Sequence, residues 1–128
     1  MHFFTILFVS KIVMIVDDDI DLLDGVNEVI SSAGYRTVTE VDGKRAPLLF
    51  REYGPDLVLT DFRMPGLNGY DSYLEIKKAN PNAKVIFMTS FPDDVRLRDA
   101  INQGEIICLK KPFSNESLLQ VIENKIGH

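Results

Sequence analysis

The chain has a single cysteine, Cys108, in 128 residues, so it can form no internal disulfide and hold no metal in a cysteine cluster. An excess of basic residues is also missing, because 14 Lys and Arg stand against 19 Asp and Glu, a formal net charge of −5. DNA and anionic membranes require a basic footprint on the protein. We therefore expect no direct nucleic-acid partner and no membrane partner.

A long hydrophobic run is the next thing that the sequence lacks. Residues 1–10 are strongly apolar, but a bilayer span takes about 20 such residues. A signal peptide would need basic residues before this run and a small-residue cleavage site after it. We divide the chain into an apolar N-terminal extension, 1–10, and one domain, 11–128. A misassigned start or a frayed tail is the simpler interpretation of the extension, and an arm that packs on a partner chain is the alternative.

Residues 11–128 alternate short apolar runs with amphipathic stretches. The runs predict strands over 12–16, 37–41, 56–60, 84–88 and 106–109. The amphipathic stretches predict a helix that ends before Gly34, helices over 44–53, 70–79 and 92–103, and a last helix after the N-cap Ser114. Such alternation is typical of an α/β domain, in which helices cover both faces of a mostly parallel sheet.

Polar groups that can do chemistry follow four of the five strands. They are Asp17, Asp18 and Asp19, then Asp61, then Thr89 and Ser90, then Lys110 and Lys111. The carboxyl ends of parallel strands meet at one edge of a sheet, so we expect these groups to converge there.

Carboxylates that converge repel one another unless a cation neutralises them. Hard oxygen donors of this kind suit Mg²⁺, which pairs naturally with phosphate. A lysine ammonium and a hydroxyl could hold further phosphate oxygens. An ionised, accessible carboxylate can itself act as a nucleophile and form an aspartyl-phosphate. The residue types therefore favour a phosphoryl group on an aspartate.

Four segments also carry a family resemblance. They are Ile15 to Asp19, Pro55 to Gly69, Val85 to Ser90 and Leu109 to Phe113. In this order they resemble the receiver domain of two-component response regulators, from about Lys11 to Ile126. The pattern D-x-x-M-P-G-x-x-G that starts at Asp61 is the most specific part. The resemblance implies a flavodoxin-like, doubly wound, five-stranded parallel sheet in the order 2-1-3-4-5 with five helices, a three-layer α/β/α fold.

The resemblance also implies a role for individual residues of this acidic site. Asp61 would accept a phosphoryl group from the phosphohistidine of a sensor histidine kinase. Asp18 would be the main Mg²⁺ ligand, with Asp17 as its acidic neighbour and Asp61 as a further ligand. Arg63 would offer its backbone carbonyl to the metal.

Thr89 would bond a phosphoryl oxygen, Lys111 would pair with the phosphoryl charge, and the peptide bond before Pro112 would be cis. One departure concerns Cys108, because the family usually has Tyr or Phe at that position. A switch that depends on this ring is therefore in doubt here, whereas the phosphorylation site is not.

The resemblance further implies a cytoplasmic signalling protein, a phosphoacceptor that promotes its own phosphorylation and dephosphorylation and is not a dedicated enzyme. Its partners would be a sensor histidine kinase and an unknown downstream protein, and a homodimer stays open.

Three other functions compete with this interpretation. A phosphatase of the haloacid dehalogenase type would use Asp17 as nucleophile in the D-x-D string Asp17 to Asp19, but it wants Thr or Val where the chain has Asp21, and it leaves Asp61 unexplained. A flavodoxin-like FMN binder would have a phosphate loop of Ser, Thr and Gly instead of carboxylates. A scaffold that is never phosphorylated would not need the intact acidic set.

Overall fold

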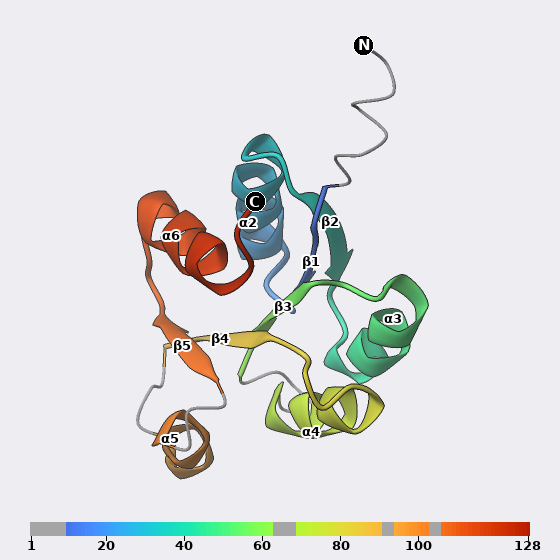
Figure 1. Cartoon of the computed structure of the whole chain (residues 1–128). Helices are drawn as coiled ribbons and strands as arrows, with labels where there is room; N and C mark the ends of the chain where they lie inside the picture. Colours follow the sequence, from blue (N-terminus) through green and yellow to red (C-terminus); the bar gives the residue numbers. More distant parts are fainter. Residues whose placement is uncertain (1–9, 63–68, 91–93, 103–105) are drawn as a thin grey trace.

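The fold is described from a computed structural model, for residues 10–62, 69–90, 94–102 and 106–128 (Figure 1). Most of the N-terminal extension (1–9) and Arg63 lie outside the described residues. In the described part of the chain, no helix is both long and apolar enough to cross a membrane.

Five strands form one sheet whose order is β2-β1-β3-β4-β5, and every neighbouring pair is parallel. The strands are β1 (Ile12–Val16), β2 (Arg36–Glu40), β3 (Leu57–Asp61), β4 (Val85–Thr89) and β5 (Ile107–Lys110). The structure thus confirms the predicted strand order, with β1 and β3 at the centre of the sheet.

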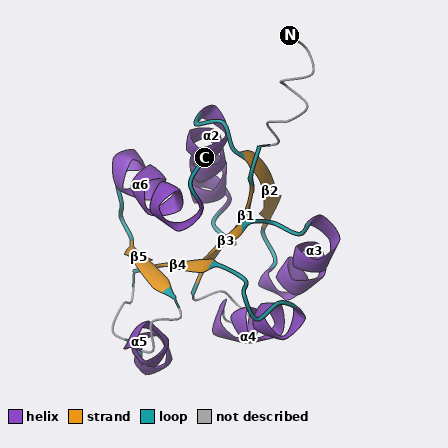
Figure 2. Cartoon of the chain, in the orientation of Figure 1, coloured by secondary structure: helices purple, strands orange, loops and turns teal. Residues whose placement is uncertain are grey.

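Helices connect the strands and lie on both faces of the sheet (Figure 2). They are α2 (Ile20–Ser32), the short 3₁₀ helix η1 (Gly43–Arg45), α3 (Ala46–Tyr53), α4 (Gly69–Ala79), α5 (Val95–Asn102) and α6 (Asn115–Ile126). Local chemistry explains several ends. The side chain of Asp19 accepts a hydrogen bond from the backbone N–H of Leu22 and caps α2, and the hydroxyl of Ser114 accepts one from Ser117 and caps α6.

Several predicted boundaries were wrong by one residue. β3 and β4 run one residue further than predicted, so Asp61 and Thr89 are the last residues of their strands and do not follow them. The cause is the ladder of the parallel sheet, in which Asp61 still pairs with Met88 and Thr89 with Lys110. The predicted helix 44–53 is also divided, because the Asp42 side chain accepts a hydrogen bond from the backbone N–H of Lys44 and starts η1.

Alternate residues of each strand enter two separate cores. On β1, Val13 and Ile15 face the side covered by α2 and α6, whereas Met14 and Val16 face the side covered by α3, α4 and α5 (Figure 1). All four side chains are fully buried. Burial on both faces explains why this strand is a continuous apolar run without alternation.

Candidate functional site at the carboxyl ends of the strands

Asp17 and Asp61 are brought together by the two central strands. Val16 lies opposite Thr60 in the parallel ladder, so the next residue of each strand reaches the same edge of the sheet. Asp17 is completely buried and Asp61 is only 9 % exposed. A backbone N–H, that of Asp19, donates to Asp17 Oδ1 at 2.9 Å, which fixes the orientation of this carboxylate.

Lys111 approaches the two carboxylates from the end of β5. Its Nζ donates to Asp17 Oδ2 at 2.9 Å and to Asp61 Oδ2 at 3.2 Å. The Lys111 backbone N–H donates to the Thr89 carbonyl at 2.8 Å, and the peptide bond between Lys111 and Pro112 is cis. The cis bond agrees with what the resemblance implies.

The ammonium of Lys111 is held in its charged form by these partners. Burial alone lowers the pKa of Lys111, but the hydrogen bond that its ammonium donates to Asp17 and the negative charges of Asp61 and Asp17 outweigh burial, so the pKa lies above its ordinary value of 10.5. One lysine therefore neutralises part of the charge of a carboxylate cluster, and negative charge is left over.

Asp17, Asp18 and Asp61 can each contribute one carboxylate oxygen to a common point, since these oxygens lie within 4.8 Å of one another. The donors are all hard oxygens, and Asp18 is exposed, so water can complete the coordination. This set fits Mg²⁺, which prefers one or two carboxylates together with water. The predicted ligand Arg63 lies outside the described residues.

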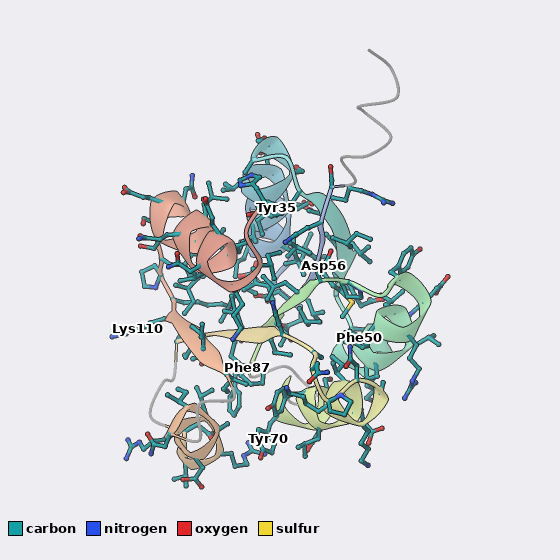
Figure 3. All side chains as sticks on the ribbon, in the orientation of Figure 1. Tyr35, Phe50, Asp56, Tyr70, Phe87 and Lys110 are labelled. Carbon is teal, nitrogen blue, oxygen red and sulfur yellow. The ribbon has the colours of Figure 1, made fainter. Side chains whose placement is uncertain are left out.

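Thr89, which belongs to the third predicted group, ends β4 and is fully buried at the same edge of the sheet. Lys110, its neighbour in the ladder, is exposed, and Figure 3 shows its side chain pointing away from the molecule. The structure thus separates Lys110 from the site and places Lys111 in it, as the alternation along β5 predicts.

Gly69 contributes to the site through the space that it leaves. A Cβ atom at this position would lie 2.2 Å from the carbonyl oxygen of Asp61 and 3.0 Å from Cα of Phe62. Any other residue would push the start of α4 away from the end of β3. This packing role was missed at the sequence level, where Gly69 was only the last residue of the D-x-x-M-P-G-x-x-G pattern, because the contact depends on the tertiary structure.

Cys108 lies on β5 opposite Phe87 and packs against the core on the α4 side of the sheet. It is partly buried, and burial raises the pKa of its thiol, so the side chain is a small apolar group here and not a reactive one. Phe87, the residue opposite Cys108, makes ring contacts with Phe62 and Tyr73 on this side of the sheet.

Comparison with known proteins gives the class that this fold and site define. The response regulator receiver domain family matches residues 13–123. The chain belongs to this family, and it is a two-component response regulator receiver domain with phosphoacceptor signalling as its family function.

Individual relatives agree with this assignment. The chain is 33 % identical to the chemotaxis protein CheY of Thermotoga maritima over 92 % of its own length and 98 % of the relative. It is 28 % identical to the sporulation initiation phosphotransferase F of Bacillus subtilis, over 87 % and 90 % of the two chains. A receiver domain structure from Clostridium thermocellum superimposes with a TM-score of 0.83 at 28 % identity, covering 91 % and 94 %.

The phosphatase alternative finds no support in these comparisons. The geometry also disfavours it, because Asp17, its nucleophile, is completely buried, whereas Asp61 retains some exposure. Receiver domains generally bind Mg²⁺ at an acidic pocket, and the structure of this chain brings three aspartates together in a cluster.

Proposed function

We propose that Asp61 accepts a phosphoryl group from the phosphohistidine of a sensor histidine kinase, and that the phosphorylated domain signals through contacts with a downstream protein. One observation carries this proposal. Asp61 is the carboxylate at the meeting point of a lysine ammonium, two further carboxylates and a buried threonine, and it is still 9 % exposed.

The step transfers one phosphoryl group from a nitrogen atom to an oxygen atom. A carboxylate oxygen of Asp61 attacks the phosphorus, an O–P bond forms, and the P–N bond to the histidine breaks. The leaving imidazole nitrogen takes up a proton from water. No oxidant, reductant or further reactant is needed.

Lys111 is the residue best placed to bind the incoming phosphoryl group. Its ammonium is already 3.2 Å from Asp61 Oδ2, and it carries a full positive charge at neutral pH. Once Asp61 is phosphorylated, the same ammonium can pair with a phosphoryl oxygen. The hydroxyl of Thr89 would donate to another of these oxygens.

Asp17, Asp18 and Asp61 would hold Mg²⁺ together with the backbone carbonyl of Arg63. When bound, the ion would offset the negative charge that the carboxylates and the phosphoryl group bring together. Asp17 has a second task in this arrangement, because its hydrogen bond with Lys111 keeps the ammonium beside the acceptor.

A sensor histidine kinase and a downstream protein are thus the expected partners, and a homodimer is left open. We further propose that residues 11–128 form the receiver domain, that the protein acts in the cytoplasm, and that it is no dedicated enzyme.

Phosphorylation by a small donor tests the proposal. We would treat the protein with acetyl phosphate and Mg²⁺ and follow its intact mass. One phosphate should be added to the wild type and to Asp56→Asn, a control at the opposite edge of the sheet, and none to Asp61→Asn. An adduct of equal yield on Asp61→Asn, or full modification in excess EDTA, would contradict the proposal.

A further inference from the structure

The helix α5 is held to the rest of the domain by few side chains. Of its eight residues only Leu97 and Ala100 are buried, the smallest number for any α-helix in the described part of the chain. Val95 in its first turn is 69 % exposed. An element with so few buried apolar contacts is the part of a fold that shifts most easily. Any additional contact that α5 makes therefore has a large influence on its position.

Arg96 supplies such a contact in the first turn of α5. Its guanidinium carbon lies 5.6 Å from the centre of the Phe62 ring and 5.7 Å from the centre of the Tyr70 ring. The side chain is oriented by Asp94, whose Oδ1 is 3.6 Å from Arg96 Nε and also accepts the Arg96 backbone N–H at 3.0 Å. One cation thus rests on two aromatic rings that belong to the end of β3 and the start of α4.

Both rings are firmly attached to the strand that ends in Asp61. Phe62 is the next residue after Asp61 and is completely buried, with its ring at 5.2 Å from that of Phe87 in an edge-on contact. Tyr70 follows Gly69, whose backbone N–H donates to the Phe62 carbonyl at 2.7 Å. Figure 3 shows Tyr70 on the side of α4 that faces α5. A small displacement at the end of β3 would therefore move both rings.

We propose that Arg96 is a positioning residue that links the state of Asp61 to the position of α5. The inference rests on the proposed function of Asp61 and concerns how phosphorylation of that residue changes the rest of the domain. The contact of Arg96 with Phe62 and Tyr70 belongs to the arrangement in which Lys111 bonds both Asp17 and Asp61.

Phosphorylation of Asp61 would disturb the contacts of Lys111 with Asp17 and Asp61. A phosphoryl group adds about −1.5 to −2 charges and draws Lys111 from its position between the two carboxylates. The end of β3 is packed tightly against Gly69, so a shift of Asp61 and Phe62 passes directly to Tyr70. Arg96 then loses its contact with the two displaced rings, and α5 is released. A cation over one ring at an exposed site changes such an equilibrium by about two- to fivefold.

Coupling of this kind is reciprocal, which gives a sharp test. Removal of the Arg96 contact should release α5 without phosphorylation and should also favour the phosphorylated arrangement of the site. We would record amide NMR spectra of the whole chain with Mg²⁺ and increasing beryllofluoride, a phosphoryl mimic. The variants are Arg96→Gln and the control Arg98→Gln, which removes another exposed arginine of the same helix.

In Arg96→Gln without beryllofluoride, we expect the amides of residues 99–102 to move toward their positions in the beryllofluoride-bound wild type. We also expect beryllofluoride to bind about two- to fivefold more tightly than to the wild type, with Arg98→Gln unchanged. Arg96→Gln spectra and affinity equal to those of the wild type would overturn the role of Arg96 and leave the proposed function intact. If beryllofluoride shifts no amide around Asp17 and Thr89 in the wild type, the proposed function fails, and the role of Arg96 fails with it.

Discussion

Residues of the same types flank both ends of the strands, and they bind different partners at the two edges of the sheet. Beyond the carboxyl ends, Lys111 bonds the side chains of Asp17 and Asp61. Before the amino ends, Lys11 and Lys84 donate instead to backbone carbonyls in the last turn of α6. One edge thus concentrates charge in side chains, and the other uses its charged side chains to satisfy the backbone.

An aspartate and a tyrosine near the amino ends of the strands also bond the backbone, unlike the aspartates at the carboxyl edge. Asp56, just before β3, accepts a hydrogen bond from the backbone N–H of Ile12 at 2.8 Å. Tyr35, just before β2, donates to the carbonyl of Gly127 at 2.9 Å. Polar groups that bond the backbone stabilise a fold, whereas several like charges brought together destabilise it. The carboxyl edge is therefore the place where the chain gives up stability for a site, and matched variants at the two edges can test this.

We expect the largest difference in stability between the two edges when a lysine is replaced at each. Lys111→Met leaves Asp17 and Asp61 without their cation and should lower the free energy of unfolding by about 2–3 kcal/mol in EDTA. This value is below that of a fully buried pair because the Lys111 side chain is 17 % exposed. Lys84→Met should change stability by less than about 0.5 kcal/mol. Urea unfolding measures both, and equal effects would contradict the contrast.

Glycines give the next test, because the carboxyl edge is also the tightly packed one. Gly69→Ala should lower the free energy of unfolding by about 1–3 kcal/mol, since its Cβ would clash with the Asp61 carbonyl. Gly25→Ala, in the middle of α2 with nothing within 4 Å of the added atom, should raise it by about 0.5–1 kcal/mol. Thermal unfolding of the two variants provides the comparison. A tolerated Gly69→Ala would show that the contact between α4 and β3 is loose.

Replacement of an aspartate by asparagine should change the free energy of unfolding in opposite directions at the two edges. Asp61→Asn removes one of three converging carboxylates that share one lysine, so it should raise the free energy of unfolding by about 1 kcal/mol in EDTA. Asp56→Asn weakens a hydrogen bond to the backbone and should lower it by about 0.5–1 kcal/mol. The pair is compared by urea unfolding at neutral pH. A loss of stability in both variants would mean that Asp61 is a structural residue as well.

The smallest effect on stability is expected at alkaline pH, where Lys111 at the carboxyl edge and Tyr35 at the amino edge lose a proton. The pKa of Lys111 is raised above 10.5 by Asp17 and Asp61 against the effect of burial, and the pKa of Tyr35 is raised above 10.0 by burial and by the charge of Glu123. A raised pKa in the folded state contributes stability below the ordinary pKa, and this stability is lost as the pH rises through the folded value.

Stability should therefore decline as the pH rises above about 10, and Lys111→Met and Tyr35→Phe should each reduce the decline. The midpoint of urea unfolding, measured between about pH 9 and pH 11.5, follows the effect. If the urea midpoint declines with pH as steeply in both variants as in the wild type, the decline belongs to other lysines and tyrosines.

Much of the fold and of the site could be predicted from the sequence. Runs such as Ile12 to Val16 mark buried strands because both faces of a central parallel strand are apolar. The parallel arrangement then brings the residues after the strands to one edge. For this reason Asp17, Asp18, Asp61, Thr89 and Lys111 could be grouped without coordinates. In the structure the side chains of the three aspartates and Lys111 lie together, and Thr89 ends β4 at the same edge.

What the sequence did not reveal depends on packing between distant elements. The space that Gly69 leaves for Asp61 and the two rings beneath Arg96 have no local signal, because the partners are set by how α4 and α5 approach the sheet. The polar residues before the strands were overlooked for a related reason. The partners of Lys11 and Lys84 are backbone carbonyls at the far end of the chain, which no pattern around these two lysines indicates.

The central claim is that one aspartate at the carboxyl edge of the sheet, Asp61, accepts the phosphoryl group. Reduction of the phosphorylated protein with borohydride converts an acyl-phosphate into an alcohol, and peptide mass spectrometry then locates the modified residue. We predict homoserine at position 61 and at no other aspartate, and none in protein that was not treated with acetyl phosphate. Homoserine at position 17 instead would contradict the account and would restore the phosphatase chemistry.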